Sequence, residues 1–296
     1  MKAGFIGVIG LPNAGKSTFV NTFVGEKVSI VTAKPQTTRQ KVLGIFNAPQ
    51  AQMIFVDTPG AIKAKEGLNR FLQQEFEKSL EESDALIAVL NMDAPDPQLL
   101  LNIIEQVESS GKPWVPIITK TDLPEAHRLL KIKEWVEEKG KPFLTVNKFR
   151  STKALREDLL EEFIKLLPES SAPLYDSELY TTQSVREMTQ EIVREKCFEN
   201  LRDELPFGLA VEIRKFDEKT SPTVKVVADL IIPKESHKPM VVGKAGSRIK
   251  HIGTQARKDI EKIVDRPVYL DLFVRVKKNW TKNQMMMKEL GYELDS

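Results

Sequence analysis

Short apolar runs and amphipathic stretches alternate along the first 167 residues of the chain. Apolar runs bounded by polar or turn residues are typical of strands buried on both faces, and the amphipathic stretches are typical of helices that cover a sheet. The alternation predicts an α/β domain, with a mostly parallel sheet and helices on both faces. Strands are expected over residues 4–10, 52–57, 85–90, 114–119 and 143–146, and helices over residues 16–24, 68–80, 98–108, 125–139 and 153–167.

The alternation ends at Pro168, and the pattern then changes twice. Residues 169–183 contain Pro, Ser, Thr and acidic residues without periodicity, which indicates a linker. Helices are expected over residues 184–200 and 246–263, and strands over residues 208–215, 224–232 and 268–276. This order predicts an α/β domain over residues 1–168 and a small α+β domain over residues 184–296, with its core at about 205–280.

Composition and charge narrow the class of protein. No apolar run approaches the roughly 18 residues that a membrane span needs, which excludes an integral membrane protein. A single cysteine, Cys197, excludes an internal disulfide framework and a multi-cysteine metal site, and it suits a reducing compartment. Residues 205–296 hold 18 Lys+Arg and 12 Asp+Glu, a net charge of +6, whereas the whole chain carries +2. This asymmetry favours a polyanionic partner for the second domain, with solvated surface charge as the alternative.

Residues 10–17, GLPNAGKS, match the P-loop pattern G-x-x-x-x-G-K-S between an expected strand and an expected helix. The glycines and the helix N-terminus allow successive backbone N–H groups to point at phosphate oxygens. Lys16 is expected to reach the β- and γ-phosphates, and the Ser17 hydroxyl is expected to bind magnesium. The nucleotide-binding residues expected here are Gly10, Asn13, Ala14, Gly15, Lys16, Ser17 and Thr18.

Two further motifs follow expected strands. In D-T-P-G, Asp57 stands where a carboxylate of the magnesium shell belongs, and the Gly60 N–H can contact the γ-phosphate. In T-K-T-D, at residues 119–122, Asp122 can accept from both N–H donors of guanine, a pair that adenine lacks. The stem of Lys120 can cover the face of the base. Each motif alone would be a polar turn, and together with the P-loop they predict a guanine-nucleotide site.

Residues 241–250, VVGKAGSRIK, hold a G-x-x-G loop at the start of a basic helix. In KH domains such a loop clamps the backbone of about four nucleotides. Basic residues supply attraction for phosphates, and Val241, Val242 and Ile249 offer an apolar floor for unstacked bases. The alternative is a turn at a helix start with surface lysines. The RNA-binding residues expected here are Val242, Gly243, Lys244, Ala245, Gly246, Arg248 and Lys250.

In combination, the P-loop, D-T-P-G and T-K-T-D motifs resemble a translation-factor-class GTPase, and further segments resemble the Era family. These segments are QTTR at residues 36–39, EIVREK at residues 191–196 and DLFVRVKKNW at residues 271–280. The resemblance implies a bacterial-type GTPase with a C-terminal KH domain. Such a protein binds single-stranded small-subunit ribosomal RNA, at its 3′ end region, and assists assembly of the 30S-type subunit.

The resemblance also implies roles for particular residues. Thr38 would be the switch threonine that binds Mg²⁺ beside Ser17 and Asp57, with Thr37 as the alternative. The catalytic positions would be Lys16, Thr38 and Gly60, and the cofactors GTP or GDP with Mg²⁺. Asn13 resembles the residue that helps to hold a potassium ion in related GTPases, and a turn-favouring role is its alternative.

Several positions bear on the expected nucleotide affinity and on the expected rate of GTP hydrolysis. The family usually has Asn where Thr119 stands, and a Ser-Ala pair contacts the base where Asn147 and Lys148 stand, so nucleotide affinity is expected to be lower. Gly60 is followed by Ala61-Ile62, which agrees with the family and offers no glutamine to orient a water. Slow intrinsic hydrolysis is therefore expected.

The expected protein is a cytoplasmic monomer, with contact at the cytoplasmic face of the membrane as a secondary implication of the resemblance. Two alternatives differ in chemistry. The first is an RNA-binding module whose GTPase half binds nucleotide but turns over poorly, and the departures at Thr119, Asn147 and Lys148 motivate it. The second is a P-loop ATPase or kinase, against which Asp122 argues. A structural scaffold would give no reason for Lys16, Ser17 and Asp57 together.

Overall fold

The structure, a computed structural model, describes residues 1–61, 64, 66–122, 126–146 and 151–294. The chain forms two compact units. Unit 1 comprises Met1–Ser29, Thr38–Lys63 and Leu72–Thr182, and unit 2 comprises Ile30–Thr37, Ala64–Phe71 and Gln183–Ser296. The second unit therefore contains two short segments from the first half of the sequence besides the expected C-terminal domain.

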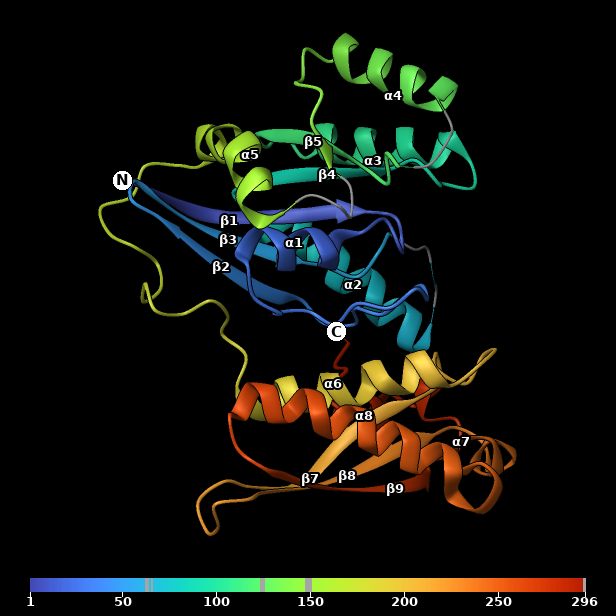
Figure 1. The fold of residues 1–296 in the computed structure, drawn as a ribbon. Helices are drawn as coiled ribbons and strands as arrows, with labels where there is room; N and C mark the ends of the chain where they lie inside the picture. The colour runs from blue at the N-terminus through green and yellow to red at the C-terminus, as the bar shows by residue number, and fades with distance from the viewer. Residues whose placement is uncertain (62–63, 65, 123–125, 147–150, 295–296) are drawn as a thin grey trace. The chain divides into compact units, whose positions relative to one another are not determined.

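Unit 1 is built on a six-stranded sheet with the strand order β2-β3-β1-β4-β5-β6 (Figure 1). All neighbouring strands are parallel except β2 and β3, which are antiparallel. Strands β3, β4 and β5 are buried along their whole length, as their apolar runs predict. The strands are β1 (Lys2–Gly10), β2 (Val42–Ala48), β3 (Ala51–Asp57), β4 (Ala85–Asn91), β5 (Trp114–Thr119) and β6 (Thr145–Val146).

Five helices accompany this sheet in the part of the chain that the structure describes. They are α1 (Lys16–Val24), α2 (Gly67–Glu82), α3 (Pro97–Ser109), α4 (Ala126–Glu138) and α5 (Thr152–Leu166). An aromatic cluster joins α1 and α5 to the sheet, with ring centroids between 5.0 and 5.9 Å apart. Its members are Phe19, Phe23, Phe55 and Phe163. Because α1 begins at Lys16, this packing fixes the helix that carries the P-loop.

Strand β2 was not expected from the sequence. It lies at the sheet edge, and four of its seven residues are only half-buried, so its apolar pattern is faint. Gly44 also interrupts the run. A Cβ atom at Gly44 would lie 2.8 Å from Val20 Cγ1, which shows how closely α1 approaches this strand.

The expected linker, residues 169–183, lies almost wholly within unit 1, which extends to Thr182. Gln52 Oε1 accepts from Leu174 N (2.7 Å) and Tyr175 N (2.9 Å). Ile45 N donates to Tyr180 O (2.8 Å). These bonds fasten the segment along β2 and β3, although it has no helix of its own.

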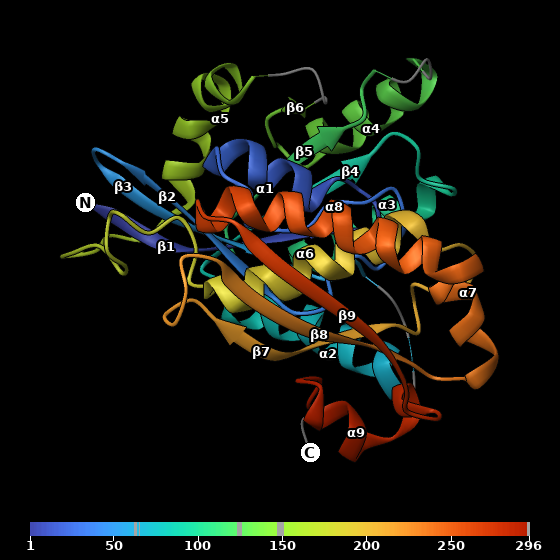
Figure 2. The ribbon, with the colours of Figure 1, turned by 60° about the horizontal axis from the view of Figure 1, so that its bottom comes forward.

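Unit 2 contains the three-stranded sheet β7-β8-β9, in which β7 and β8 are antiparallel and β8 and β9 are parallel. Helices α6 and α8 lie side by side on one face of the sheet and share its apolar core (Figure 2). The main elements are α6 (Val185–Asn200), β7 (Ala210–Asp217), β8 (Val224–Ile232), α7 (Lys238–Val242), α8 (Ser247–Val264), β9 (Val268–Val276) and α9 (Gln284–Glu289). Short 3₁₀ turns lie at Glu235–His237, Lys244–Gly246 and Trp280–Lys282.

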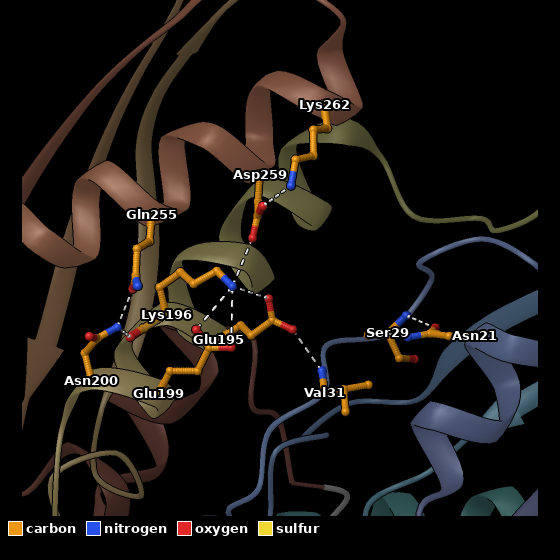
Figure 3. A network of polar contacts seen from close by, with 10 residues as sticks. All are labelled: Asn21, Ser29, Val31, Glu195, Lys196, Glu199, Asn200, Gln255, Asp259 and Lys262. Carbon is orange, nitrogen blue, oxygen red and sulfur yellow. Dashed lines mark hydrogen bonds and ion pairs between the residues drawn. The ribbon is translucent and has the colours of Figure 1, made fainter. Parts of the chain in front are cut away.

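Helix α6 is held to α8 by a partly buried network of charges (Figure 3). Lys196 Nζ lies 2.9 Å from Asp259 Oδ2 of α8, and 3.2–3.3 Å from carboxylate oxygens of Glu195 and Glu199. Burial opposes the charge, but the hydrogen bond to Asp259 and the charges of Glu195 and Glu199 raise the pKa of Lys196. Glu195 also accepts from Val31 N (3.0 Å), which ties segment Ile30–Thr37 to α6.

The buried residues of unit 2 include two that the sequence left without a chemical role. Cys197 is fully buried in α6, and Trp280 is fully buried and donates from Nε1 to Gly208 O (2.9 Å). Both side chains therefore contribute to the packing of unit 2.

In the described part of the chain, no helix has the length and apolar character needed to span a membrane.

Candidate functional site

The P-loop joins β1 to α1 at the carboxyl edge of the sheet of unit 1. Asn13 and Gly15 have left-handed backbone conformations, with φ of 61° and 94°. Glycine adopts this region freely, and asparagine does so more readily than most residues. The loop therefore curls as its sequence pattern predicts, ahead of the first turn of α1.

Lys16 is buried inside this loop. Its Nζ donates to Gly10 O (3.2 Å) and Leu11 O (2.9 Å). Burial lowers the pKa of Lys16 to about 8, and the charge of Asp57 opposes the shift. A bound polyphosphate would bring negative charge to the ammonium group and favour its protonated form. The loop thus holds a cation whose two backbone carbonyl partners, Gly10 O and Leu11 O, can be replaced by phosphate oxygens.

Three oxygen-bearing side chains from different segments meet beside Lys16. Thr38 Oγ1 lies 3.0 Å from Ser17 Oγ, and it donates to Asp57 Oδ2 (3.4 Å). Asp57 is fully buried, and its Oδ1 has no hydrogen-bond partner among the described residues. Burial raises the pKa of Asp57, while the Ser17 hydroxyl and the Lys16 charge oppose the shift.

This donor set fits a magnesium ion. Mg²⁺ prefers hard oxygen ligands, is usually bound by one or two carboxylates, and keeps other positions for water and phosphate. A cation here would satisfy the unpartnered oxygen of Asp57 and offset the cost of burying its charge.

The two threonines of the switch segment have different surroundings. The Thr37 hydroxyl lies 2.7 Å from Thr32 Oγ1 and donates to Lys34 O (2.8 Å), so it is used within its own segment. Only Thr38 of this pair lies with Ser17 and Asp57. Of the two candidate threonines, the structure places Thr38 with the other proposed magnesium ligands, and Thr38 remains the one proposed to bind the ion.

The loop after β3 sits against the P-loop. Ala61 N donates to Gly10 O (3.1 Å), and the Thr58 hydroxyl donates to Val8 O (2.9 Å). A Cβ atom at Gly60 would lie 2.5 Å from Pro12 Cα and 2.7 Å from Pro12 Cγ. Glycine is therefore required at residue 60 by space. Ile62 lies outside the described residues.

The T-K-T-D motif begins at Thr119, the last residue of β5, on the other side of the P-loop. Thr119 is buried, and its hydroxyl donates to Ala14 O (2.7 Å), so it ties the end of β5 to the P-loop. Lys120 has a left-handed backbone, with φ of 58°, and its ammonium contacts Asp93. Asp122 is exposed. Asn147 and Lys148, also expected to bind nucleotide, lie outside the described residues.

Asp93 was missed by reasoning from the sequence. Asp93 follows β4 and does not belong to a recognisable motif. Its partner, Lys120, is 27 residues away in the sequence. The signal that could have found it is its position after the end of a buried parallel strand, next in the sheet to the strand that carries T-K-T-D.

The G-x-x-G loop of unit 2 joins the short helix α7 to α8. Gly243, Ala245 and Gly246 have φ of 76°, 49° and 76°. Lys244, Arg248 and Lys250 are all exposed, and the guanidinium group of Arg248 also donates to Met240 O and so supports the loop. A Cβ atom at Gly243 would lie 2.7 Å from Arg248 Cβ, but one at Gly246 meets nothing within 4 Å.

One expectation about this loop is wrong. Val241 is fully buried, because α7 turns it into the core of unit 2, and it cannot serve as a floor for bases. Val242 and Ile249 are only partly buried and stay accessible.

Two family models match the chain. One is described as a 50S ribosome-binding GTPase and matches residues 5–120, and the other is described as a KH domain and matches residues 204–281. GTPase Era of Nitratidesulfovibrio vulgaris strain DP4 is 38% identical over 305 residues, which cover 99% of this chain and 98% of the relative. GTPase Era of Geotalea uraniireducens strain Rf4 is 35% identical, with 99% of this chain and 98% of the relative covered.

Two crystal structures are similar over nearly the whole chain. One is a variant of Aquifex aeolicus Era bound to GDP and AlF₄⁻, with a TM-score of 0.90 and 32% identity, covering 99% of this chain and 100% of that chain. The other is Era in complex with MgGDPNP and nucleotides 1506–1542 of 16S ribosomal RNA, with the same TM-score, identity and coverage. The fold class predicted from the sequence, a P-loop GTPase domain followed by a KH domain, is confirmed.

Proposed function

This chain belongs to the Era family of GTPases, and on this premise we propose that it is a GTP-dependent switch whose C-terminal unit binds the 3′ end region of small-subunit ribosomal RNA. The process it serves is assembly of the small ribosomal subunit. The relative in complex with MgGDPNP and 16S ribosomal RNA supports the proposal for all three ligands, namely the nucleotide, the metal and the RNA. In this chain, the observation that carries the proposal is the meeting of Ser17, Thr38 and Asp57 beside Lys16.

Each residue of this cluster has a distinct task. Lys16 binds the β- and γ-phosphates, and Ser17, Thr38 and Asp57 hold Mg²⁺. When bound, Mg²⁺ neutralises charge on the β- and γ-phosphate oxygens. The Gly60 N–H contacts the γ-phosphate, so loss of that phosphate releases both Gly60 and Thr38 and frees the switch segments.

Hydrolysis must proceed without a glutamine after Gly60. Ala61 has no polar side-chain group that could orient the attacking water, so intrinsic turnover is slow. A potassium ion held by Asn13 against the phosphates would supply positive charge. Its test compares phosphate release in potassium and sodium salts at equal ionic strength, with Asn13→Ala expected to abolish the difference. Equal rates for the wild-type protein in both salts would reduce Asn13 to a turn residue.

The base is selected at the T-K-T-D motif. Asp122 accepts from the two N–H donors on the Watson–Crick edge of guanine, and Thr119 keeps the motif tied to the P-loop through Ala14 O. The hydroxyl of Thr119 thus retains a hydrogen bond at a position where the family usually has Asn. Asn147 and Lys148 complete the proposed nucleotide contacts.

RNA binding is assigned to the G-x-x-G loop, residues 243–246, with Val242, Arg248 and Lys250. Space around Gly246 is open, so the phosphate chain can approach the backbone there. Two exposed lysines and the N-terminus of α8 add positive potential.

The RNA assignment is tested with Gly246→Asp. The Asp side chain enters open space, and Asp tolerates a positive φ better than most residues, so the fold is expected to survive. RNA affinity should fall at least about tenfold, because the carboxylate lies among phosphates. Lys244→Ala should have a smaller effect. It should lower the slope of log RNA affinity against log salt concentration by about one unit or less. Unchanged GDP binding is the control for folding, and wild-type RNA affinity in Gly246→Asp would place the RNA elsewhere.

The cellular setting follows from the same proposal. A monomer working on ribosomal RNA belongs in the cytoplasm, and the buried free thiol of Cys197 suits a reducing compartment. The basic segment 243–250 can also meet anionic headgroups at the cytoplasmic membrane face. Sedimentation with anionic vesicles, with and without RNA, tests that contact.

A further inference from the structure

The end of β4 lies beside the T-K-T-D motif. Asn91, the last residue of β4, pairs with Thr119 of β5. Met92 N then donates to Thr119 O (3.1 Å), which continues the pairing one step past the strand. Asp93 is therefore positioned by the sheet itself, next to the residues proposed to hold the base.

Two hydrogen bonds fix the Asp93 carboxylate. Lys120 Nζ donates to Asp93 Oδ2 (2.5 Å), and Asn91 Nδ2 donates to Asp93 Oδ1 (2.6 Å). Burial alone would raise the pKa of Asp93, but the hydrogen bonds from Lys120 and Asn91 and the charge of Lys120 lower it below its ordinary value. The carboxylate is thus ionised at neutral pH and is held from two sides.

The contact is poorly explained as a stabiliser of the fold. The side chains of Lys120 and Asp93 are 32% and 41% exposed, and ion pairs at such exposure contribute little to stability. At the same time, Lys120 keeps a left-handed backbone, a conformation that is costly for a lysine and that clusters at functional sites.

We propose that Asp93 is a positioning residue for guanine, which fixes the Lys120 ammonium so that the stem of Lys120 lies across the base. This inference rests on the guanine site proposed above. A lysine stem has many rotamers, and ordering it during binding would weaken affinity. Asp93 orders its far end beforehand. The bound base then shields the ion pair from water, which strengthens it in the complex.

The test measures GDP affinity for Asp93→Asn, which keeps the shape of the side chain and removes its charge. The dissociation constant is expected to rise about threefold to tenfold. The KM for GTP should rise by a similar factor with kcat unchanged, because the base contact is the same in the ground and transition states. In a Lys120→Met background, Asp93→Asn should have no further effect on GDP binding.

Glu108→Gln is the matched control. Glu108 pairs with Lys139 at 2.8 Å, with side chains 32% and 43% exposed, on the same unit and away from the site. It should bind GDP like the wild type, and all variants should unfold at the same temperature without nucleotide. If Asp93→Asn binds GDP normally while Lys120→Met binds weakly, the inference is overturned and the guanine site stands. If Lys120→Met also binds normally, or the wild type binds ADP as well as GDP, the guanine site falls too.

Discussion

Substituting Gly60 by alanine should separate the triphosphate state from the diphosphate state. The added Cβ atom would lie 2.5 Å from Pro12 Cα and 2.7 Å from Pro12 Cγ. Both distances are far inside van der Waals contact, and the atoms belong to the backbone and ring of a proline, which cannot rotate away. The loop after β3 must therefore move off the P-loop, and the hydrogen bond from Ala61 N to Gly10 O must lengthen.

The cost can be estimated from the crowding. Forcing one methyl group into a packed site typically costs about 1–3 kcal/mol. The loop can relieve this strain by withdrawing Gly60 from the place proposed for the γ-phosphate. The cost should then appear in binding of a GTP analogue, as an affinity loss of about fivefold to 150-fold. GDP lacks the γ-phosphate and should bind almost normally.

The assay is calorimetric titration of GDPNP and GDP, both with Mg²⁺, into wild-type protein and Gly60→Ala. Gly140→Ala is the control, because its Cβ atom would meet nothing within 4 Å although its φ is 62°. That variant should lose about 1 kcal/mol of folding stability and no nucleotide affinity. Equal losses for GDP and GDPNP in Gly60→Ala, or no loss for either, would refute the reasoning about the γ-phosphate.

Three other variants or probes test separate parts of the account. Thr119→Val removes the hydroxyl that donates to Ala14 O, and it should weaken GDP binding about fivefold, or about 1 kcal/mol. An unchanged dissociation constant for GDP would show that this hydrogen bond has no role in nucleotide binding. Asp122→Asn should weaken GTP binding roughly tenfold to 150-fold and shift preference toward the xanthine nucleotide in a competition assay, and unaltered GTP binding would contradict the assignment. Burial raises the pKa of Cys197 to about 12, so a disulfide reagent at pH 8 should label it only after unfolding in urea, and rapid labelling of the native protein would contradict its burial.

The parts of the site that sequence could predict are those whose geometry is local. The P-loop turns because Gly15 and Asn13 tolerate left-handed angles, and eight consecutive residues encode that turn. The family resemblance is confirmed over 99% of the chain. Asp57 is the last residue of β3, and parallel strands bring their carboxyl ends to one edge of the sheet, so its approach to the P-loop follows from topology.

What the sequence could not predict depends on partners that are distant along the chain. Strand β2 has a faint apolar pattern, and it is recognised as a strand only from its antiparallel pairing with β3. Val241 was assigned to an RNA surface because a five-residue helix is too short to reveal which face is buried. The Asp93–Lys120 contact joins the ends of two strands, and no local pattern connects them. Segment Ile30–Thr37 contacts α6 within unit 2 through the hydrogen bond between Val31 and Glu195. Neither the sequence of this segment nor that of α6 indicates this contact.

If nucleotide and RNA binding are functions of one switch, the affinity of the protein for RNA must depend on the bound nucleotide. The decisive measurement titrates the 296-residue chain into a labelled RNA of the 16S 3′ end, once with GDPNP and Mg²⁺ and once with GDP and Mg²⁺. RNA should bind more tightly with GDPNP than with GDP, by about fivefold or more. By reciprocity, the same RNA must raise the preference for GDPNP over GDP by the same factor. Equal RNA affinity in the two nucleotide states would show that nucleotide binding and RNA binding are not coupled.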